Sequence, residues 1–324
     1  MLSYLRCSAG GKEGWGNLFR LLIIRQYLIK KYKSKVILII NSNLDVKNFL
    51  KKKKINFIYL DKKKLDYEKK KICNLKRSDL TIIEMLNPIV ELQKLYLKKS
   101  KRVVVLDDIL ENKYFSDLVI SCQNSIKKPS ISKKTSFFSG YEYFPFREEF
   151  NKYFKKKKII KKEINKITVF LGGSSYEKIN YQIAKKLKNF NKTKFIFGSE
   201  LNQKFKRKIL KINKSFKILK LPNNIAETLF TSDLVISGGG YAKIETACVG
   251  TPQISVPVHS HQLTLLSNFS KKFGSKYISL SRLKLLDKLI KNFTFKKRCI
   301  ESKKYKIFFI KNGVEKIFKK IKNA

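Results

Sequence analysis

The chain has 324 residues, of which 43% are hydrophobic and 12% aromatic, enough for two folded domains and too much for a mainly disordered chain. No apolar stretch reaches the roughly 18–20 residues of a bilayer-spanning helix, because Arg20 and Arg25 interrupt the longest one. The first residues lack the regions of a secretory signal, and five scattered cysteines suit a reducing compartment, so we expect a cytoplasmic protein.

The charge balance is extreme, with 73 lysines and arginines against 24 acidic residues and a net charge of +49. Lysines dominate, and runs such as 51–54 and 155–158 lie between apolar segments throughout the chain. A nucleic-acid-binding protein usually concentrates its charge and prefers arginine, so dedicated nucleic-acid binding is not expected. A solvated surface and a peripheral contact with an anionic membrane both remain open.

Runs typical of strands alternate with helix-length segments along the chain. The first half has expected strands at 2–9, 35–40, 56–60, 80–86, 102–108, 118–121 and 135–141, with a long helix over 17–32. The second half has expected strands at 167–173, 194–199, 216–221, 233–239, 252–258 and 276–280, with helices over 180–190 and 242–250.

Continuous Val, Ile and Leu runs separated by helices indicate parallel sheets covered on both faces. We therefore predict the α/β class, with two Rossmann-like, doubly wound domains. The lysine-rich stretch 151–166 is the expected boundary, which gives an N-terminal domain over 1–150 and a C-terminal domain over 151–324. The last helix is expected to pack back on the first domain.

The first glycine-rich loop, Gly10–Asn17, follows the first expected strand and opens the long helix. Its glycines, Gly14 and Gly16 among them, allow positive φ angles, and the N–H groups at a helix start attract anions. Many α/β proteins use such a loop for packing alone. Packing and anion binding therefore both remain open.

The second loop, Leu171–Ser175, again joins an expected strand to a helix. Gly173 and the hydroxyls of Ser174 and Ser175 suit a phosphate group. The alternative is a plain N-cap for the following helix.

The most informative loop runs from Ser237 through Gly239 and Gly240 into the helix that contains Glu245. An ionised carboxylate about one turn into this helix can accept hydrogen bonds from two ribose hydroxyls. The glycines and the helix N-terminus can face a diphosphate. The alternative for Glu245 is a surface carboxylate.

His259 and His261, the two histidines of the chain, follow the expected strand 252–258, and Gln262 comes directly after them. Loops at the carboxyl ends of parallel strands are where such folds contact ligands. The histidines can contact phosphate, protonate a leaving group or act as a base near neutral pH. Ordinary loop histidines are the alternative, and no third ligand at a supporting spacing points to a metal.

Asp107 and Asp108 end the expected strand 102–108. An N-cap or cleft-lining role is the main interpretation, and a magnesium-binding acidic pair is the alternative.

Together with these loops, further segments follow the order and spacing of segments in a known protein family. They are 106–121, 140–150, 171–187, 223–252 and 311–321. Together they make the chain similar to the UDP-sugar hydrolases of pseudaminic acid biosynthesis and their spore-coat-polysaccharide relatives, which have the GT-B architecture. The second half also resembles the N-acetylglucosaminyl transferase that completes lipid II. The stretch from Ser237 to Pro252 is the most specific part of this resemblance.

The resemblance implies that 1–150 is a sugar or acceptor domain and 151–324 a nucleotide-binding domain. UDP would sit between them and be held mostly by the second one. Glu245 would bind the ribose, and Tyr241 with the segment 221–224 would line the uracil. The residues expected near the diphosphate are Gly173, Ser174, Gly239 and Gly240, and those expected at sugar or phosphate are Gly14, Gly16, His259 and Gln262. Helix dipoles would stabilise the departing UDP, so no cofactor or metal is expected.

Two departures from the family pattern affect catalysis. Asn17 stands where the family has histidine, and losing general-base help typically costs about 10²–10⁴-fold in rate. Glu84-Met85-Leu86 stands where the hydrolases have Asp-His-Tyr. The catalytic candidates are Asn17, Glu84, Asp108 and His261.

The resemblance favours an enzyme of surface-glycan biosynthesis that cleaves the anomeric C1–O bond of a UDP-sugar and releases UDP, as the hydrolases do. An inverting GT-B glycosyltransferase is the first alternative, because the lost histidine is consistent with a changed acceptor. An inactive homologue that binds nucleotide-sugars is the second alternative.

Overall fold

The computed structural model describes residues 1–10, 13–60, 65–124, 128–174, 176–198, 202–220, 222 and 224–323. The chain divides into two compact units: unit 1 is Met1–Phe146 with Asn312–Ala324, and unit 2 is Arg147–Lys311. The division falls a few residues before the expected boundary at 150, because Arg147 and Glu149 already make their side-chain contacts within unit 2. The last segment belongs to unit 1 instead of the second unit.

The strands of unit 1 are β1 (Leu2–Ala9), β2 (Lys35–Ser42), β3 (Phe57–Tyr59), β4 (Leu80–Glu84), β5 (Val103–Leu106), β6 (Lys113–Tyr114), β7 (Leu118–Ser121), β8 (Ser130–Ile131) and β9 (Ser136–Ser139). Its helices are α1 (Gly16–Tyr32), α2 (Leu44–Lys52), α3 (Leu65–Cys73), α4 (Val90–Lys99) and α13 (Val314–Asn323). The main sheet is parallel, in the order β3-β2-β1-β4-β5-β7-β9, and β6 pairs separately with β8.

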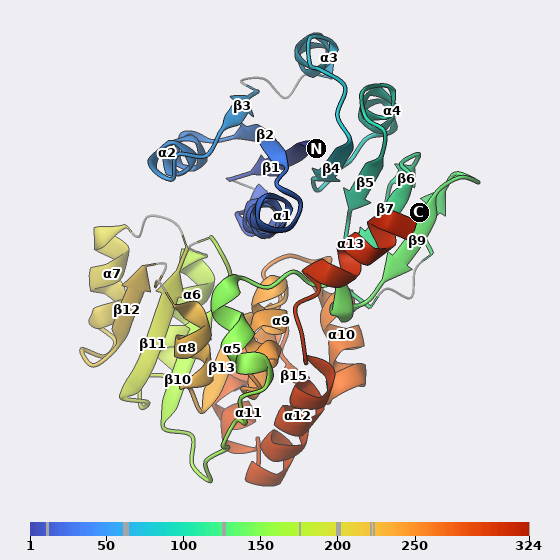
Figure 1. Cartoon of the computed structure of the whole chain (residues 1–324). Helices are drawn as coiled ribbons and strands as arrows, with labels where there is room; N and C mark the ends of the chain where they lie inside the picture. Colours follow the sequence, from blue (N-terminus) through green and yellow to red (C-terminus); the bar gives the residue numbers. More distant parts are fainter. Residues whose placement is uncertain are drawn as a thin grey trace. The chain divides into compact units, whose positions relative to one another are not determined.

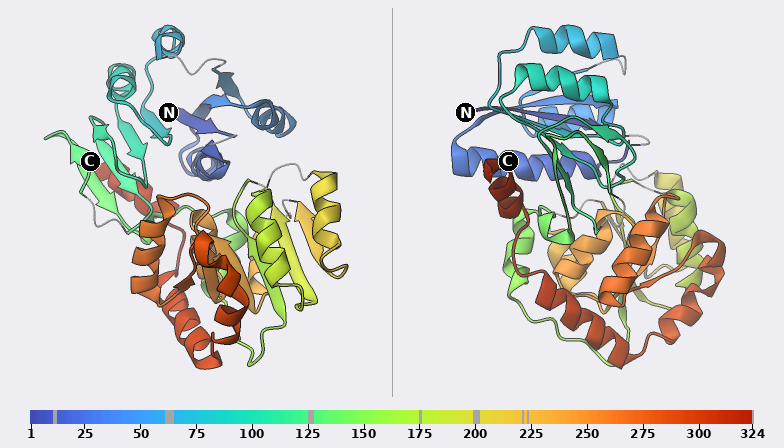
Figure 2. Two further views of the ribbon diagram at one scale, coloured as in Figure 1. Left: turned by 180° about the vertical axis from the view of Figure 1, so that it is seen from behind. Right: turned by 90° about the vertical axis from the view of Figure 1, so that its right-hand side faces the viewer.

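Helices cover both faces of the sheet in unit 1, with α1 and α2 on one face and α3 and α4 on the other (Figure 1). Right-handed crossovers require this arrangement, because the strand order reverses direction between β1 and β4. In α1, buried Leu21, Ile24 and Leu28 recur every three or four residues and form its core-facing stripe. Helix α13 lies beside α1, where the rings of Phe318 and Tyr27 are 4.8 Å apart (Figure 2).

The strands of unit 2 are β10 (Lys166–Phe170), β11 (Lys192–Phe197), β12 (Lys217–Lys220), β13 (Leu234–Gly238), β14 (Gln253–Val256) and β15 (Lys276–Tyr277). Its helices are α5 (Asn151–Phe154), α6 (Glu177–Lys186), α7 (Gln203–Leu210), α8 (Ile225–Phe230), α9 (Tyr241–Cys248), α10 (Gln262–Phe273), α11 (Leu286–Lys291) and α12 (Phe295–Phe308). The sheet is parallel, in the order β12-β11-β10-β13-β14-β15.

One hydrophobic core of unit 2 lies between this sheet and helices α6, α7 and α11, with Val169, Phe197 and Ile236 among its buried side chains. Both units therefore confirm the predicted α/β class with doubly wound parallel sheets. Several strands are shorter than expected; for example, β4 stops at Glu84, and β15 contains only Lys276 and Tyr277. Within the described ranges, no helix combines the length and apolarity needed to cross a membrane.

A buried polar network joins α12 to β13 and α9. The side-chain amide of Gln253 donates to the Lys243 carbonyl at 2.9 Å and accepts a hydrogen bond from the Ser237 hydroxyl at 2.6 Å. Glu301 of α12 accepts hydrogen bonds from the Gln253 backbone N–H at 3.4 Å and from the Tyr305 hydroxyl. Burial raises the pKa of Glu301 from its ordinary value of 4.5 to about 8.

This raised pKa predicts how stability changes with pH. The folded unit 2 favours the protonated form of Glu301. The contribution of Glu301 to the free energy of unfolding is therefore complete below pH 4.5 and is lost as the pH rises towards 8. Across this window the free energy of unfolding falls as the pH rises, because only the unfolded state has released the Glu301 proton. Glu301→Gln should remove this slope in thermal unfolding measured from pH 5 to 8.

The exposed Glu163 supplies the matched control, because Glu163→Gln should leave the slope unchanged. An unchanged slope in Glu301→Gln would show that the carboxyl group is ionised in the folded protein at pH 5.

Candidate functional site

The strand order of unit 2 reverses direction between β10 and β13, because the chain runs from β10 to β11 on one side and from β13 to β14 on the other. In doubly wound sheets, ligands bind beyond the carboxyl ends of the strands at such a switch point. The loop after β10 contains Gly173 and Ser174, and the turn after β13 contains Gly239 and Gly240. Two of the predicted phosphate loops therefore lie at the position that the fold favours.

Close backbone packing explains the glycines that flank these loops. A Cβ on Gly238 would lie 2.1 Å from the Leu171 carbonyl oxygen, and one on Gly198 would lie 2.2 Å from the Gly173 carbonyl oxygen. The ends of β10, β11 and β13 can approach each other only because these positions carry no side chain. The loop after β10 is thus fixed against both neighbouring strands.

Gln262, the first residue of α10, packs against the turn after β13. A Cβ on Gly239 would lie 2.8 Å from Gln262 Oε1, and the same oxygen accepts a hydrogen bond from the Val258 N–H at 2.9 Å. Gly240 is the N-cap of α9, and a Cβ there would meet only Gln262 Nε2, at 3.6 Å. The turn is therefore tightly packed at Gly239 and more open at Gly240, next to the positive end of α9.

Glu245 lies in α9, and 13% of its side chain is exposed. Its Oε1 accepts a hydrogen bond from Arg147 Nη2 at 2.7 Å. Burial raises the pKa of Glu245, and the nearby Arg147 guanidinium opposes that rise. A carboxylate has about four lone-pair sites, so a single bond to Arg147 leaves capacity for ligand hydroxyls.

Arg147 also lies 3.8 Å from Glu149. Glu149 in turn accepts the N–H groups of Ile225 at 2.9 Å and Ala226 at 3.3 Å, at the start of α8. The first residues of unit 2 therefore have two roles: Arg147 orients Glu245, the residue predicted to bind the ribose, and Glu149 caps helix α8.

The two histidines differ in their surroundings. His259 is exposed, its Nε2 lies 3.3 Å from the Tyr176 hydroxyl, and the two rings meet edge to face. Burial raises the pKa of Tyr176, and its hydrogen bond with Ser174 opposes this rise, so both His259 and Ser174 contact the same tyrosine. His261 is exposed, and its ring stacks on that of His259 with centroids 5.6 Å apart.

The predicted glycine loop of unit 1 follows β1, at the switch point between β1 and β4. Gly10 and Gly14 have φ angles of 86° and 70°, and the Gly10 N–H donates to the Gly14 carbonyl at 2.7 Å. Gly16 is the first residue of α1. Asn17 follows it with 9% of its surface exposed, and its Nδ2 has no hydrogen-bond partner among the described residues.

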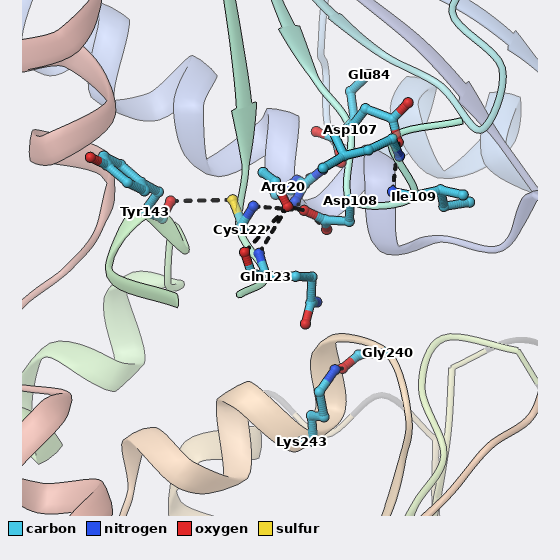
Figure 3. A network of polar contacts seen from close by, with 12 residues as sticks. Arg20, Glu84, Asp107, Asp108, Ile109, Cys122, Gln123, Tyr143, Gly240 and Lys243 are labelled. Carbon is cyan, nitrogen blue, oxygen red and sulfur yellow. Dashed lines mark hydrogen bonds and ion pairs between the residues drawn. The ribbon is translucent and has the colours of Figure 1, made fainter. Parts of the chain in front are cut away.

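The carboxylates of Glu84 and Asp108 are joined by Arg20 of α1 (Figure 3). Arg20 Nε lies 2.5 Å from Glu84 Oε1, and Nη1 lies 2.9 Å from Asp108 Oδ2. The side chains of Arg20 and Glu84 are almost completely buried, and that of Asp108 is 10% exposed. The other Asp108 oxygen accepts the Cys122 N–H at 2.6 Å.

Asp107 has a structural role of the kind that the sequence suggests. Its carboxylate accepts the Tyr114 hydroxyl at 2.6 Å and the Ile109 N–H at 2.8 Å, which closes the turn after β5. Asp107 and Asp108 therefore point to different partners and do not form an acidic pair. In the described part of the chain, no three His, Cys, Asp or Glu side chains are grouped so that they could hold a metal ion.

Each unit thus brings together its own share of the predicted site residues. Unit 2 gathers Gly173, Ser174, Gly239, Gly240, Tyr241, His259 and Gln262 at one edge of its sheet, with Glu245 further along α9. Unit 1 gathers Gly14, Gly16, Asn17, Glu84 and Asp108 at the ends of β1, β4 and β5. Ser175 of the expected phosphate loop and Leu221 and Asn223 of the expected uracil segment lie outside the described residues.

Three basic residues at these sites were not singled out from the sequence: Arg20, Arg147 and Lys243. Arg20 interrupts the apolar stretch 18–24. A charged residue on the face of a helix that is otherwise apolar is a sequence signal for a buried ion pair. Lys243, on the buried side of α9, could not be distinguished by type from the many other lysines.

Residues 167–321 match the glycosyltransferase family 28 C-terminal domain. The chain is 26% identical over 287 residues to the uncharacterized protein MJ1062 of Methanocaldococcus jannaschii, which covers 82% of this chain and 57% of that protein. It is 23% identical over 219 residues to the spore coat polysaccharide biosynthesis protein SpsG of Bacillus subtilis, which covers 64% of each. The chain thus spans about three fifths of the length of the curated relatives that it matches.

Among solved structures, MurG of Acinetobacter baumannii aligns over 100% of this chain and 99% of its own, with a TM-score of 0.67 and 13% identity. Anabaena HepE in complex with UDP and glucose aligns over 100% of both chains, with a TM-score of 0.62 and 12% identity. The predicted GT-B fold is therefore confirmed. The narrower likeness to pseudaminic-acid hydrolases stays a prediction.

Proposed function

We propose that the chain is a UDP-sugar-processing enzyme of glycan biosynthesis that cleaves the anomeric C1–O bond and releases UDP. The observation that carries this proposal is the position of the turn Gly239–Gly240 at the switch point of unit 2, with Glu245 in the helix that follows. This turn lies inside the segment that matches the glycosyltransferase family 28 C-terminal domain. HepE, which shares the fold, binds UDP and glucose.

In this proposal unit 2 binds the nucleotide. The N–H groups at the start of α9 and the loop of Gly173 and Ser174 bind the diphosphate, because a helix start carries partial positive charge. Glu245, oriented by Arg147, accepts hydrogen bonds from the ribose hydroxyls. The same positive groups stabilise the negative charge that develops on UDP as the C1–O bond breaks.

Unit 1 supplies the sugar side of the reaction. A buried amide donor without a partner costs about 1–3 kcal/mol, so we assign the Nδ2 of Asn17 to a sugar or phosphate oxygen of the substrate. Arg20 forms ion pairs with both Glu84 and Asp108 and fixes the position of the two carboxylates. These contacts support an orienting role for the two carboxylates, and they do not distinguish water from an acceptor hydroxyl as the nucleophile.

Glycosyl transfer is therefore a full alternative to hydrolysis. The net charge of +49 would also favour peripheral contact with an anionic membrane, where a lipid-linked acceptor would be available. A homologue that only binds nucleotide-sugars is the remaining alternative.

A panel of UDP-sugars tests the proposal, with UDP release measured in the presence and absence of acceptor sugars. Release in water alone supports hydrolysis, and release only with an acceptor supports transfer. Tight UDP binding without turnover supports the binding-only alternative, and Asn17→His should then restore some hydrolysis. Failure to bind UDP or any UDP-sugar would contradict the proposed function altogether.

A further inference from the structure

Lys243 lies in the first turn of α9 with no solvent exposure, and its ammonium group contacts the glycine turn directly. Its Nζ donates to the Gly239 carbonyl at 2.6 Å and to the Gly240 carbonyl at 3.1 Å. Figure 3 shows the lysine close to Gly240 at the start of the helix. The Lys243 backbone is also fixed, because its carbonyl accepts a hydrogen bond from Gln253 at 2.9 Å.

A cation at this position is unfavourable for an isolated helix. The N-terminus of a helix already carries partial positive charge and favours acidic side chains. Burying an ammonium group adds a desolvation cost that backbone carbonyls offset only in part. A bound anion at the same turn would interact favourably with both the helix end and the lysine.

The contacts of Lys243 also determine which way the turn faces. In a trans peptide, the carbonyl and the following N–H point in opposite directions. Because the Gly239 and Gly240 carbonyls point towards Nζ, the N–H groups of Gly240 and Tyr241 point away from it. Gly240 is also the more open position of the turn.

We propose that Lys243 is a positioning residue for the diphosphate: it holds the N–H groups of the turn outward and places a full positive charge behind them. This inference rests on the proposed function, and it names Lys243 as the residue whose charge makes the site prefer a ligand that carries a diphosphate. Lys243 would act through the turn and through its charge, without touching the substrate.

Two substitutions separate the charge from the hydrogen bonds. Lys243→Met keeps a similar volume and removes both, whereas Lys243→Gln removes the charge and keeps an N–H donor for the carbonyls. Kd values for UDP and for uridine are measured by calorimetry, with competition against UDP for the weaker ligand. Lys304→Met, which changes an exposed lysine of α12, is the matched control.

Removal of the charge should weaken UDP binding by roughly 10- to 100-fold and leave uridine binding within about 3-fold, because only UDP carries the diphosphate. Lys243→Gln should retain more UDP affinity than Lys243→Met, and Lys304→Met should match the unmodified chain. Equal losses for UDP and uridine, or unchanged UDP affinity in either folded variant, would overturn the role of Lys243. Absence of UDP binding by the unmodified chain would instead overturn the proposed function itself.

Discussion

Replacement of Glu245 by alanine should weaken UDP binding by about 1–3 kcal/mol, which corresponds to roughly 5- to 150-fold in Kd. The physical reason is the loss of charge-assisted hydrogen bonds to the ribose from a carboxylate that Arg147 already orients. Calorimetry with UDP measures the loss. Since the Glu245 side chain is mostly buried, the fold of the variant should be checked by thermal unfolding.

A modified ligand distinguishes a ribose contact from a general disturbance of the site. The unmodified chain should prefer UDP over 2′-deoxy-UDP. Glu245→Ala should reduce this preference, because the variant lacks the carboxylate that accepts a hydrogen bond from the 2′-hydroxyl. The exposed Glu163 again provides the control, and Glu163→Ala should preserve both affinity and preference. Unchanged UDP affinity in a folded Glu245→Ala variant would show that this carboxylate does not bind the nucleotide.

Removal of Arg20 should have the largest effect on stability. Arg20→Met leaves Glu84 and Asp108 without the guanidinium that joins them, in surroundings where the glutamate is almost fully buried. Breaking a buried ion pair by deleting one partner typically costs about 3–5 kcal/mol. Chemical denaturation followed by tryptophan fluorescence reports directly on unit 1, because Trp15 is the only tryptophan of the chain.

Arg25, which is on the same helix, provides the matched control for this substitution. In the described residues its Nε has no hydrogen-bond partner, so Arg25→Met should cost much less than Arg20→Met. Combining Arg20→Met with Glu84→Gln should recover part of the loss, because one of the two stranded charges is removed. Equal stability of the Arg20 and Arg25 variants would mean that the ion pairs contribute nothing to unit 1.

The parts of the site that could be predicted from the sequence are those with a local signal. Gly239, Gly240 and Glu245 occupy positions in a turn and a helix that directly follow a strand, and this local pattern is what predicts an anion site here; the site itself stays a prediction. The same holds for Gly173 after β10. The reversal of strand order that places these loops side by side was implied by the doubly wound class, and the structure confirms it.

The contacts that orient these residues have no local signal. Arg20 meets Glu84 and Asp108, which are 64 and 88 residues away in the sequence, and their pairing appears only when β4 and β5 lie next to each other. Arg147 likewise reaches Glu245 across 98 residues. The expected boundary at 150 lies a few residues after the start of unit 2 at Arg147 for the same reason, because Arg147 and Glu149 contact distant parts of unit 2.

The return of α13 to unit 1 determines how the protein can be divided. Because Asn312–Ala324 completes unit 1, unit 2 is a contiguous insertion within a discontinuous host domain. A fragment that ends at residue 146 would lack the helix whose Phe318 packs on Tyr27, and would expose the apolar stripe that this helix covers. A fragment over 147–311 interrupts no element of its own sheet, so it is the better choice for testing in isolation the nucleotide binding that we propose for unit 2.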